Sequence, residues 1–204
     1  MMRNLWFISV LVLIFSSCNH FICINSHTEN IAGKMAMSGL FDSINVRKFQ
    51  ARIDFKSIEM SGILIFKKIN DSISAGSFIN EFGIKGFDFT QTKKGTRFSY
   101  LIKKLDKWYI RKTLANDLHF LFLRPELQTS CSLDDKSVFV TTINRSLHYV
   151  YYFVNGQRIE TADMYKGKHK IATLEQKLTE GNGFILRMGH TDGSMKYEFY
   201  ELKK

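Results

Sequence analysis

Apolar and polar residues alternate along most of the chain after residue 48, which is the period of a strand with one buried face. The first five segments with this pattern are residues 49–55, 60–69, 73–80, 82–89 and 96–104. In the fourth segment, Gly83 and Gly86 predict a bend or a bulge. In the fifth, Phe98 and Tyr100 are expected to share a face. The pattern therefore predicts five antiparallel strands joined by short turns.

The hydrophobic period changes in the middle of the chain. Apolar residues recur there at helical spacing at Ile110, Leu114, Leu118 and Leu121. Asp106 precedes them as an N-cap and Pro125 follows them, so we expect a helix over residues 106–122. Asn116 and Asp117 leave an alternative in which the helix breaks and the residues after them are extended.

Strand periodicity returns in residues 137–143, 147–154, 157–165, 169–178, 183–189 and 194–202. Asn155-Gly156 and Asp192-Gly193 are strong hairpin signals. The expected fold is mainly β: a curled antiparallel meander of about ten strands, forming a half-barrel or a barrel. The inserted helix is expected to plug or cover the concave side. A short N-terminal helix is expected over residues 35–45, within a single domain of residues 35–204.

Composition supports a strand-rich fold and adds a strong positive charge. The 204 residues include 18 Phe and 8 Tyr but only 1 Pro, and aromatic residues favour strands. A net charge of +10 suits nucleic acid, anionic lipid or acidic polysaccharide as a partner. Lys and Arg are spread along the strand segments, which is typical of a solvated basic face. An exported chain makes nucleic acid the least expected of these partners.

The N-terminus has the pattern of an export signal. Arg3 precedes the apolar run Leu5–Phe15, which is too short to span a bilayer, since a spanning helix takes about 20 residues. The run ends in Phe15-Ser16-Ser17-Cys18, which resembles the lipobox of bacterial lipoproteins, although leucine is usual in place of Phe15. An ordinary signal peptide or an uncleaved anchor is the alternative.

The lipobox resemblance implies a place in the cell envelope. It makes residues 1–17 a signal peptide, Cys18 a lipidated cysteine bearing acyl chains such as palmitate, and residues 18–34 a tether to a membrane. In Bacteroidetes-like lipoproteins an acidic cluster after the cysteine marks surface export, and none is present here. The expected location is therefore the periplasmic side of the outer membrane. Cys23 and Cys131 are left as free thiols or as a disulfide.

The order of elements also resembles a known family. A lipobox, a short helix, antiparallel strands, a helix and more strands is the layout of the lipoprotein-carrier half-barrels, the carrier and receptor proteins of bacterial lipoprotein sorting. At the residue level the resemblance lies in Met60–Phe89, where Ser-Gly opens one apolar strand and Phe-Gly opens the next. The resemblance implies a half-barrel with a hydrophobic slot for acyl chains or lipoproteins.

Side chains on the predicted inner face are the candidate lining of such a slot. They are Phe49, Ile53, Phe55, Phe66, Phe78, Phe87, Phe89, Phe98 and Tyr100. Each buried CH2 contributes roughly 0.8 kcal/mol, so a 16-carbon chain would contribute on the order of 10 kcal/mol before ordering costs. The alternative is that these side chains pack a solid core.

No catalytic or metal-binding signature accompanies the pattern. The sequence contains no G-x-S-x-G motif, P-loop or Rossmann fingerprint, and its six histidines lack metal-ligand spacing. We therefore expect no enzyme activity, no metal and no cofactor. Two functions remain as expectations: an envelope lipoprotein that binds acyl chains or lipoproteins, in lipoprotein sorting or envelope biogenesis, and a structural or adhesin-type lipoprotein with a packed core.

Overall fold

The computed structural model describes most of the chain after residue 45. The described ranges are residues 46–56, 58–70, 72–122, 129–133, 136–144, 146–154, 158–179 and 183–202, without the side chains of 129–144, 153, 154, 158 and 159. The expected signal peptide, Cys18, the tether and the short helix at residues 35–45 lie outside the described residues, and so do Cys23 and the side chain of Cys131.

Twelve strands and one helix form in the described residues. The strands are β1 (Val46–Phe55), β2 (Ile58–Lys68), β3 (Ile73–Asn80), β4 (Lys85–Thr92), β5 (Gly95–Leu101), β6 (Thr129–Leu133), β7 (Lys136–Asn144), β8 (Leu147–Val154), β9 (Arg158–Lys166), β10 (His169–Leu178), β11 (Phe184–His190) and β12 (Met195–Leu202). The helix is α2 (Trp108–Phe122). Every second residue of β1 is buried, which is the alternation that predicted this strand.

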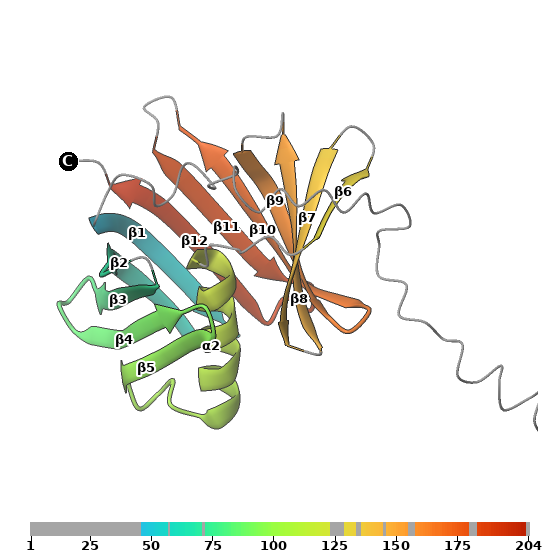
Figure 1. The fold of residues 1–204 in the computed structure, drawn as a ribbon. Coiled ribbons are helices and arrows are strands. Elements are labelled where there is room, and N and C mark those ends of the chain that lie inside the picture. The colour runs from blue at the N-terminus through green and yellow to red at the C-terminus, as the bar shows by residue number, and fades with distance from the viewer. Residues whose placement is uncertain are drawn as a thin grey trace, which may run out of the picture.

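All of these strands belong to one antiparallel sheet, in the order β5-β4-β3-β2-β1-β12-β11-β10-β9-β8-β7-β6. The first and last strands pair in its middle, with Phe49 opposite Glu201 and Phe55 opposite Met195. The two edge strands, β5 and β6, follow each other in the sequence, and α2 lies between them in the chain. The sheet curls without closing, so the predicted half-barrel fold is confirmed (Figure 1).

Helix α2 lies inside the curl of the sheet (Figure 1). The ring of Phe122 has its centroid 4.8 Å from that of Phe66 on β2 and 5.7 Å from that of Phe199 on β12. The ring of Phe120 lies 4.7 Å from that of Tyr149 on β8. The predicted helix is confirmed, and it continues through Asp117 without a break. It begins at Trp108, so Asp106 is not its N-cap, and the Asp106 carboxylate instead accepts hydrogen bonds from Arg111.

The structure departs from the predicted strand pattern at β6 and in β5. Strand β6 was not predicted, because its sequence, Thr-Ser-Cys-Ser-Leu, has only five residues, of which two are apolar. In β5, the register against β4 shifts, so that Phe98 lies opposite Phe89 but Tyr100 lies opposite Asp88. This bulge at Ser99 turns Tyr100 to the face opposite Phe98, and the prediction that the two share a face was wrong.

The two glycines of the fourth segment do interrupt the strand. Gly83 has a φ of 77° in the turn between β3 and β4, a conformation that suits glycine. Gly86 lies at a register shift, since Phe78 pairs with Phe87 and the next residue, Ile79, pairs with Lys85. The predicted bend and bulge are therefore confirmed.

Candidate functional site

Seven of the nine candidate lining residues are buried in the core of the half-barrel. They are Phe49, Ile53, Phe55, Phe66, Phe78, Phe87 and Phe89. Phe98 is partly buried and packs against the same core. Tyr100 is 44% exposed, because the bulge at Ser99 places it on the convex face. The structure therefore brings eight of these residues together and places Tyr100 outside the interior.

Several of these rings pack on one another and over glycines. Phe78 stacks on Phe87 with ring centroids 5.2 Å apart, and Phe87 lies 6.1 Å from Phe89. A Cβ on Gly76 would lie 2.3 Å from the ring of Phe89, and a Cβ on Gly86 would lie 2.7 Å from the ring of Phe78. Because glycine has no Cβ, the rings of Phe89 and Phe78 can pack directly over Gly76 and Gly86. This part of the concave face is a packed core, and space for a ligand has to lie elsewhere.

An apolar groove of about 200 Å³ opens at the end of the half-barrel that carries the β3–β4 turn and the β5–α2 loop. It is lined by Ile58, Glu59, Met60, Ser61, Phe78, Asn80, Glu81, Phe82, Ile84, Lys85, Gly86, Ile102, Lys104 and Leu105. Phe78 is the one candidate lining residue among them. A dry cavity of about 150 Å³ is enough to bind benzene, so a groove of this size accepts the end of an acyl chain.

The β3–β4 turn beside the groove presents two apolar side chains to solvent. The side-chain oxygen of Asn80 accepts hydrogen bonds from the backbone N–H of Phe82 (3.0 Å) and of Ile84 (2.8 Å). The N–H of Gly83 donates to the backbone oxygen of Asn80 at 3.0 Å. Phe82 is 86% exposed and Ile84 is 54% exposed. These hydrogen bonds hold both side chains in place at the mouth of the groove.

Asp117 fixes α2 to the C-terminal strands through buried polar contacts. Nε2 of His190 lies 3.0 Å from both carboxylate oxygens of Asp117, and the Tyr197 hydroxyl donates a hydrogen bond of 2.6 Å to Oδ2. Burial raises the pKa of Asp117, against the opposing effect of these hydrogen bonds. Burial lowers the pKa of His190, but Asp117 more than offsets this, and the net shift is upward. Removing one partner would leave a buried polar group without its hydrogen bonds, so the contacts hold the helix in place.

His119 makes a second polar anchor on the same helix. Its Nε2 lies 3.2 Å from the backbone oxygen of Thr92, and its Nδ1 lies 3.1 Å from the hydroxyl of Tyr149. A carbonyl oxygen only accepts, so Nε2 carries the proton and Nδ1 accepts from the Tyr149 hydroxyl. Burial lowers the pKa of His119, which keeps the ring neutral. Two buried anchors therefore hold α2 from both sides, one at β11 and β12 and one at β4 and β8.

The convex face carries a wider and more polar hollow of about 720 Å³. It is lined by Gln50, Ala51, Arg52, Glu59, Met60, Ser61, Glu81, Glu198 and Tyr200. Arg52 lies 3.4 Å from Asp54 and 3.6 Å from Glu59, so its charge is already compensated. In the described part of the chain, no three His, Cys, Asp or Glu side chains form a group suited to a metal ion. In the part of the chain that the structure describes, no helix is both long enough and apolar enough to cross a membrane.

The sequence pattern missed most of the groove and both anchors. Met60 and Ile102 lie near strand ends, where alternation does not separate a groove residue from a core residue. Phe82 was assigned to a strand, although Asn80 three residues before Gly83 is a turn signal. Asp117 and His190 are 73 residues apart in the sequence, and no local pattern connects them.

The chain resembles several solved structures in fold. No family model and no curated protein matches it. A LolA superfamily protein from Nitrosomonas europaea has 13% identity and a TM-score of 0.49, over 78% of this chain and 83% of that one. An outer membrane lipoprotein-sorting protein domain from Vibrio parahaemolyticus has 11% identity and a TM-score of 0.48, over 78% and 84%. A DUF1329 family protein from Desulfovibrio piger has 11% identity and a TM-score of 0.42, over 79% and 85%. At these identities the similarity concerns the fold alone.

Proposed function

We propose that this protein is a membrane-anchored lipoprotein on the periplasmic side of the cell envelope, where it binds the acyl chains of lipids or lipoproteins in lipoprotein sorting or envelope biogenesis. In this proposal Cys18 carries the lipid anchor, and the protein has no enzyme activity. The observation that supports acyl binding is the apolar groove, which runs from the exposed side chains of Phe82 and Ile84 to the buried ring of Phe78.

The size of the groove sets the expected affinity. About six methylene groups, each near the roughly 30 Å³ of a water molecule, occupy about 200 Å³. At roughly 0.8 kcal/mol each, they contribute about 5 kcal/mol before ordering costs. Such a gain corresponds to a Kd no tighter than about 0.2 mM. A site of this strength exchanges its ligand quickly, which suits transfer of a lipid rather than storage.

Two positions on β2 provide a matched test of this proposal. Met60 is partly buried on the concave side and lines the groove, whereas Ile63 lies on the opposite face and is 43% exposed. Met60→Glu is expected to weaken the binding of dodecanoate at least tenfold, because it puts a charge beside the chain. Ile63→Glu is expected to leave binding unchanged. The assay is isothermal titration calorimetry, in which burial of the chain gives a negative heat-capacity change.

The two variants carry the same added charge on the same strand, so a difference between them locates the ligand. Absence of saturable binding by the unmodified protein, or an equal loss in both variants, would contradict the proposal. Circular dichroism on both variants confirms that each is folded before the titrations are compared.

A structural or adhesin-type lipoprotein is the second candidate function. The packed aromatic core favours it, since Phe66 stacks on Phe122 of α2 with centroids 4.8 Å apart. On this alternative the unmodified protein binds no acyl chain, and Met60→Glu changes stability alone.

A further inference from the structure

The end of the half-barrel that carries the groove also gathers the exposed aromatic side chains. Among the described residues, the aromatic side chains that are 40% exposed or more are Phe82 (86%), Tyr100 (44%), Trp108 (78%) and Tyr109 (41%). All four lie near this end: one in the β3–β4 turn, one at the end of β5 and two at the start of α2. Exposed aromatic rings that gather on one surface are typical of a contact site.

The strand order explains why these side chains lie together. The β1–β2 turn, the β3–β4 turn and the β5–α2 loop share one end of an antiparallel meander, and the β2–β3 and β4–β5 turns lie at the other. Phe82 and Lys104 line the same groove, so the turn and the loop are neighbours. Trp108 follows the loop directly, and its ring lies edge-on to that of Tyr109, with centroids 6.0 Å apart.

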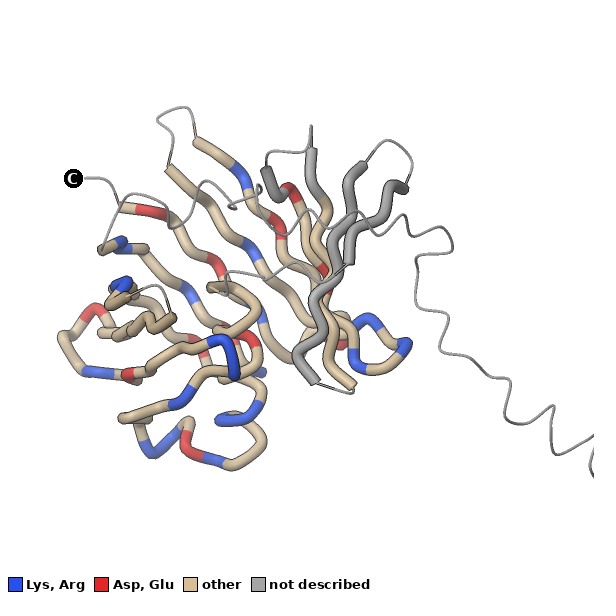
Figure 2. The backbone as a smooth tube through the Cα atoms, in the orientation of Figure 1, with Lys and Arg blue, Asp and Glu red and all other residues tan. Residues whose placement is uncertain are grey.

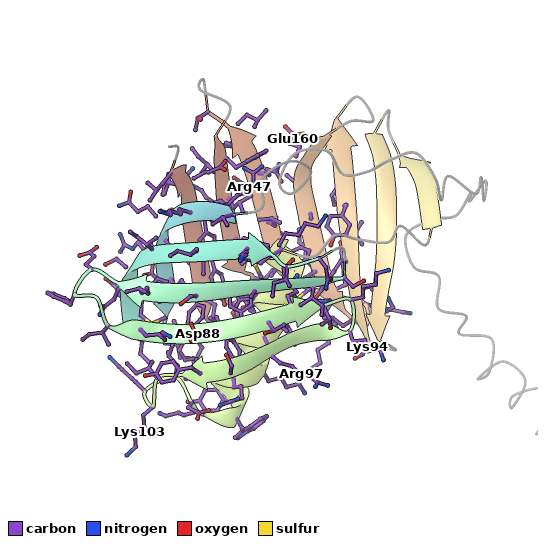
Figure 3. All side chains as sticks on the ribbon, turned by 60° about the vertical axis from the view of Figure 1, so that its left-hand side comes forward. Arg47, Asp88, Lys94, Arg97, Lys103 and Glu160 are labelled. Carbon is purple, nitrogen blue, oxygen red and sulfur yellow. The ribbon has the colours of Figure 1, made fainter. Side chains whose placement is uncertain are left out.

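Three lysines lie in the loop that leads to Trp108, on the side of the groove away from Glu59 in β2 and Glu81 at the end of β3. Lys103, Lys104 and Lys107 are exposed in the loop before α2, and no ion pair is found for any of them in the described part of the chain. Asp106, the one acid of this loop, is paired with Arg111 at 2.7 Å. Figure 2 shows the basic segments at the foot of α2, and Figure 3 shows Lys103 pointing away from the domain.

We infer that this end of the half-barrel docks on a bilayer surface with anionic headgroups. Trp108 and Phe82 enter the interface, where amphipathic and aromatic rings are favoured. Lys103, Lys104 and Lys107 lie beside the lipid phosphates, and each lysine near an anionic surface strengthens binding. The inference does not depend on acyl binding. If both hold, the groove opens directly at the bilayer.

The expected lipid anchor is compatible with this orientation. β1 starts at Val46, at the end opposite the groove, and its ten residues span about 33 Å. Residues 19–45, between Cys18 and Val46, number 27 and reach at most about 90 Å when extended. An anchored chain of that length allows the groove end to face the membrane that holds Cys18.

Trp108 itself reports on this docking. The sequence has 2 Trp, Trp6 and Trp108, so the segment Gly33–Lys204 contains only Trp108, together with all twelve strands and the whole described core. The emission of Trp108 is titrated with vesicles of phosphatidylcholine alone or mixed with phosphatidylglycerol. A blue shift is expected with the mixed vesicles, absent with phosphatidylcholine alone, and lost near 1 M salt, where the Debye length is about 3 Å.

Two triple variants test whether vesicle binding depends on the lysines at this end or on the overall positive charge. Replacing Lys103, Lys104 and Lys107 by Gln is expected to weaken vesicle binding about a hundredfold, at about fivefold for each lysine. The control replaces three exposed lysines at the opposite end: Lys48, Lys67 and Lys94. It is expected to bind nearly as well as the unmodified segment. Phe82→Ser, with Trp108 intact, is expected to weaken binding and reduce the blue shift.

Four results would overturn the inference. They are no emission change with mixed vesicles, an equal shift with neutral vesicles, an equal loss in both triple variants, and a dimer in solution that Phe82→Ser converts to a monomer. The last would make this end a contact between two copies of the chain. Acyl binding is measured separately by calorimetry, so a failure of bilayer docking can be distinguished from a failure of acyl binding.

Discussion

Truncation of Phe122 tests whether α2 is a fixed part of the core. The side chain is 3% exposed, and its ring centroid lies 4.8 Å from that of Phe66, 5.7 Å from that of Phe199 and 6.1 Å from that of Phe49. Phe122→Ala therefore removes a ring enclosed by the strands and leaves a cavity. Substitutions of this kind cost about 3–5 kcal/mol.

This loss of unfolding free energy is large enough to measure as a shift in Tm or in the urea midpoint. A domain of this kind is stable by about 5–15 kcal/mol, so Phe122→Ala removes about a fifth of the total or more. For domains of about 150–250 residues each kcal/mol shifts Tm by about 2–4 °C, which predicts a fall of roughly 6–20 °C. Urea unfolding followed by circular dichroism gives the midpoint and the slope. The slope is expected to stay unchanged, because the surface exposed on unfolding is nearly the same.

Trp108→Ala is the control, because it removes an aromatic side chain from the other end of the same helix. Trp108 is 78% exposed, so its loss is expected to change stability by about 0.5 kcal/mol or less. A loss below about 1 kcal/mol for Phe122→Ala would refute the packing described for α2. It would mean that the helix is loosely held and that the interior is open.

Three further predictions concern the polar anchor, a close contact and the lipid. The pKa of His190 is raised in the folded protein, so protonation of His190 stabilises the fold fully below about pH 6.5, and this contribution is lost as the pH rises through the pKa of the folded state. The urea midpoint should therefore fall on going to about pH 8.5, and it should fall less in His190→Asn. Gly62→Ala should lower Tm by several degrees, because a Cβ would lie 2.1 Å from the backbone oxygen of Ile79. Cys18→Ser should make the protein extractable from membranes with about 1 M salt, where docking of the groove end is also lost, as shown by cell fractionation and by the intact mass of the N-terminal peptide.

The first two of these predictions each have a control variant. His169→Asn removes an exposed histidine and should keep the pH dependence of the unmodified protein. Ser61→Ala changes the exposed neighbour of Gly62 and should leave Tm within about 2 °C. A flat pH profile for the unmodified protein, an unchanged Tm for Gly62→Ala, or Cys18→Ser protein that stays with the membranes in about 1 M salt would each contradict its prediction.

Most of the fold is predictable because most strands have one buried face. β1 alternates strictly from Phe49 to Phe55, and the sequence shows this without any knowledge of its partners. The helix is predictable for the same reason, from the spacing of its leucines. β6 was missed because five residues with two apolar side chains give too short a periodic signal. Tyr100 was misplaced because a one-residue bulge reverses the faces of the residues after it.

The candidate site was only partly predictable. The pattern found the inward-facing phenylalanines, but it did not show that Gly76 and Gly86 let two of the rings lie flat and close the space. It also left open whether the helix breaks at Asp117. The helix continues because Asp117 is satisfied by His190, a partner 73 residues away in the sequence. Contacts of this range depend on the folded sheet, so local propensity does not reveal them.

The position of a bound acyl chain tests the central proposal most directly. Dodecanoate is added to the protein, and the chemical shifts of methyl resonances, which respond to contacts of a few ångströms, are followed by NMR. The proposal predicts saturable shift changes at Met60 and Ile102, which line the groove, and none at Ile63 on the opposite face of β2. Equal changes at all three positions, or none at any, would contradict binding in the groove.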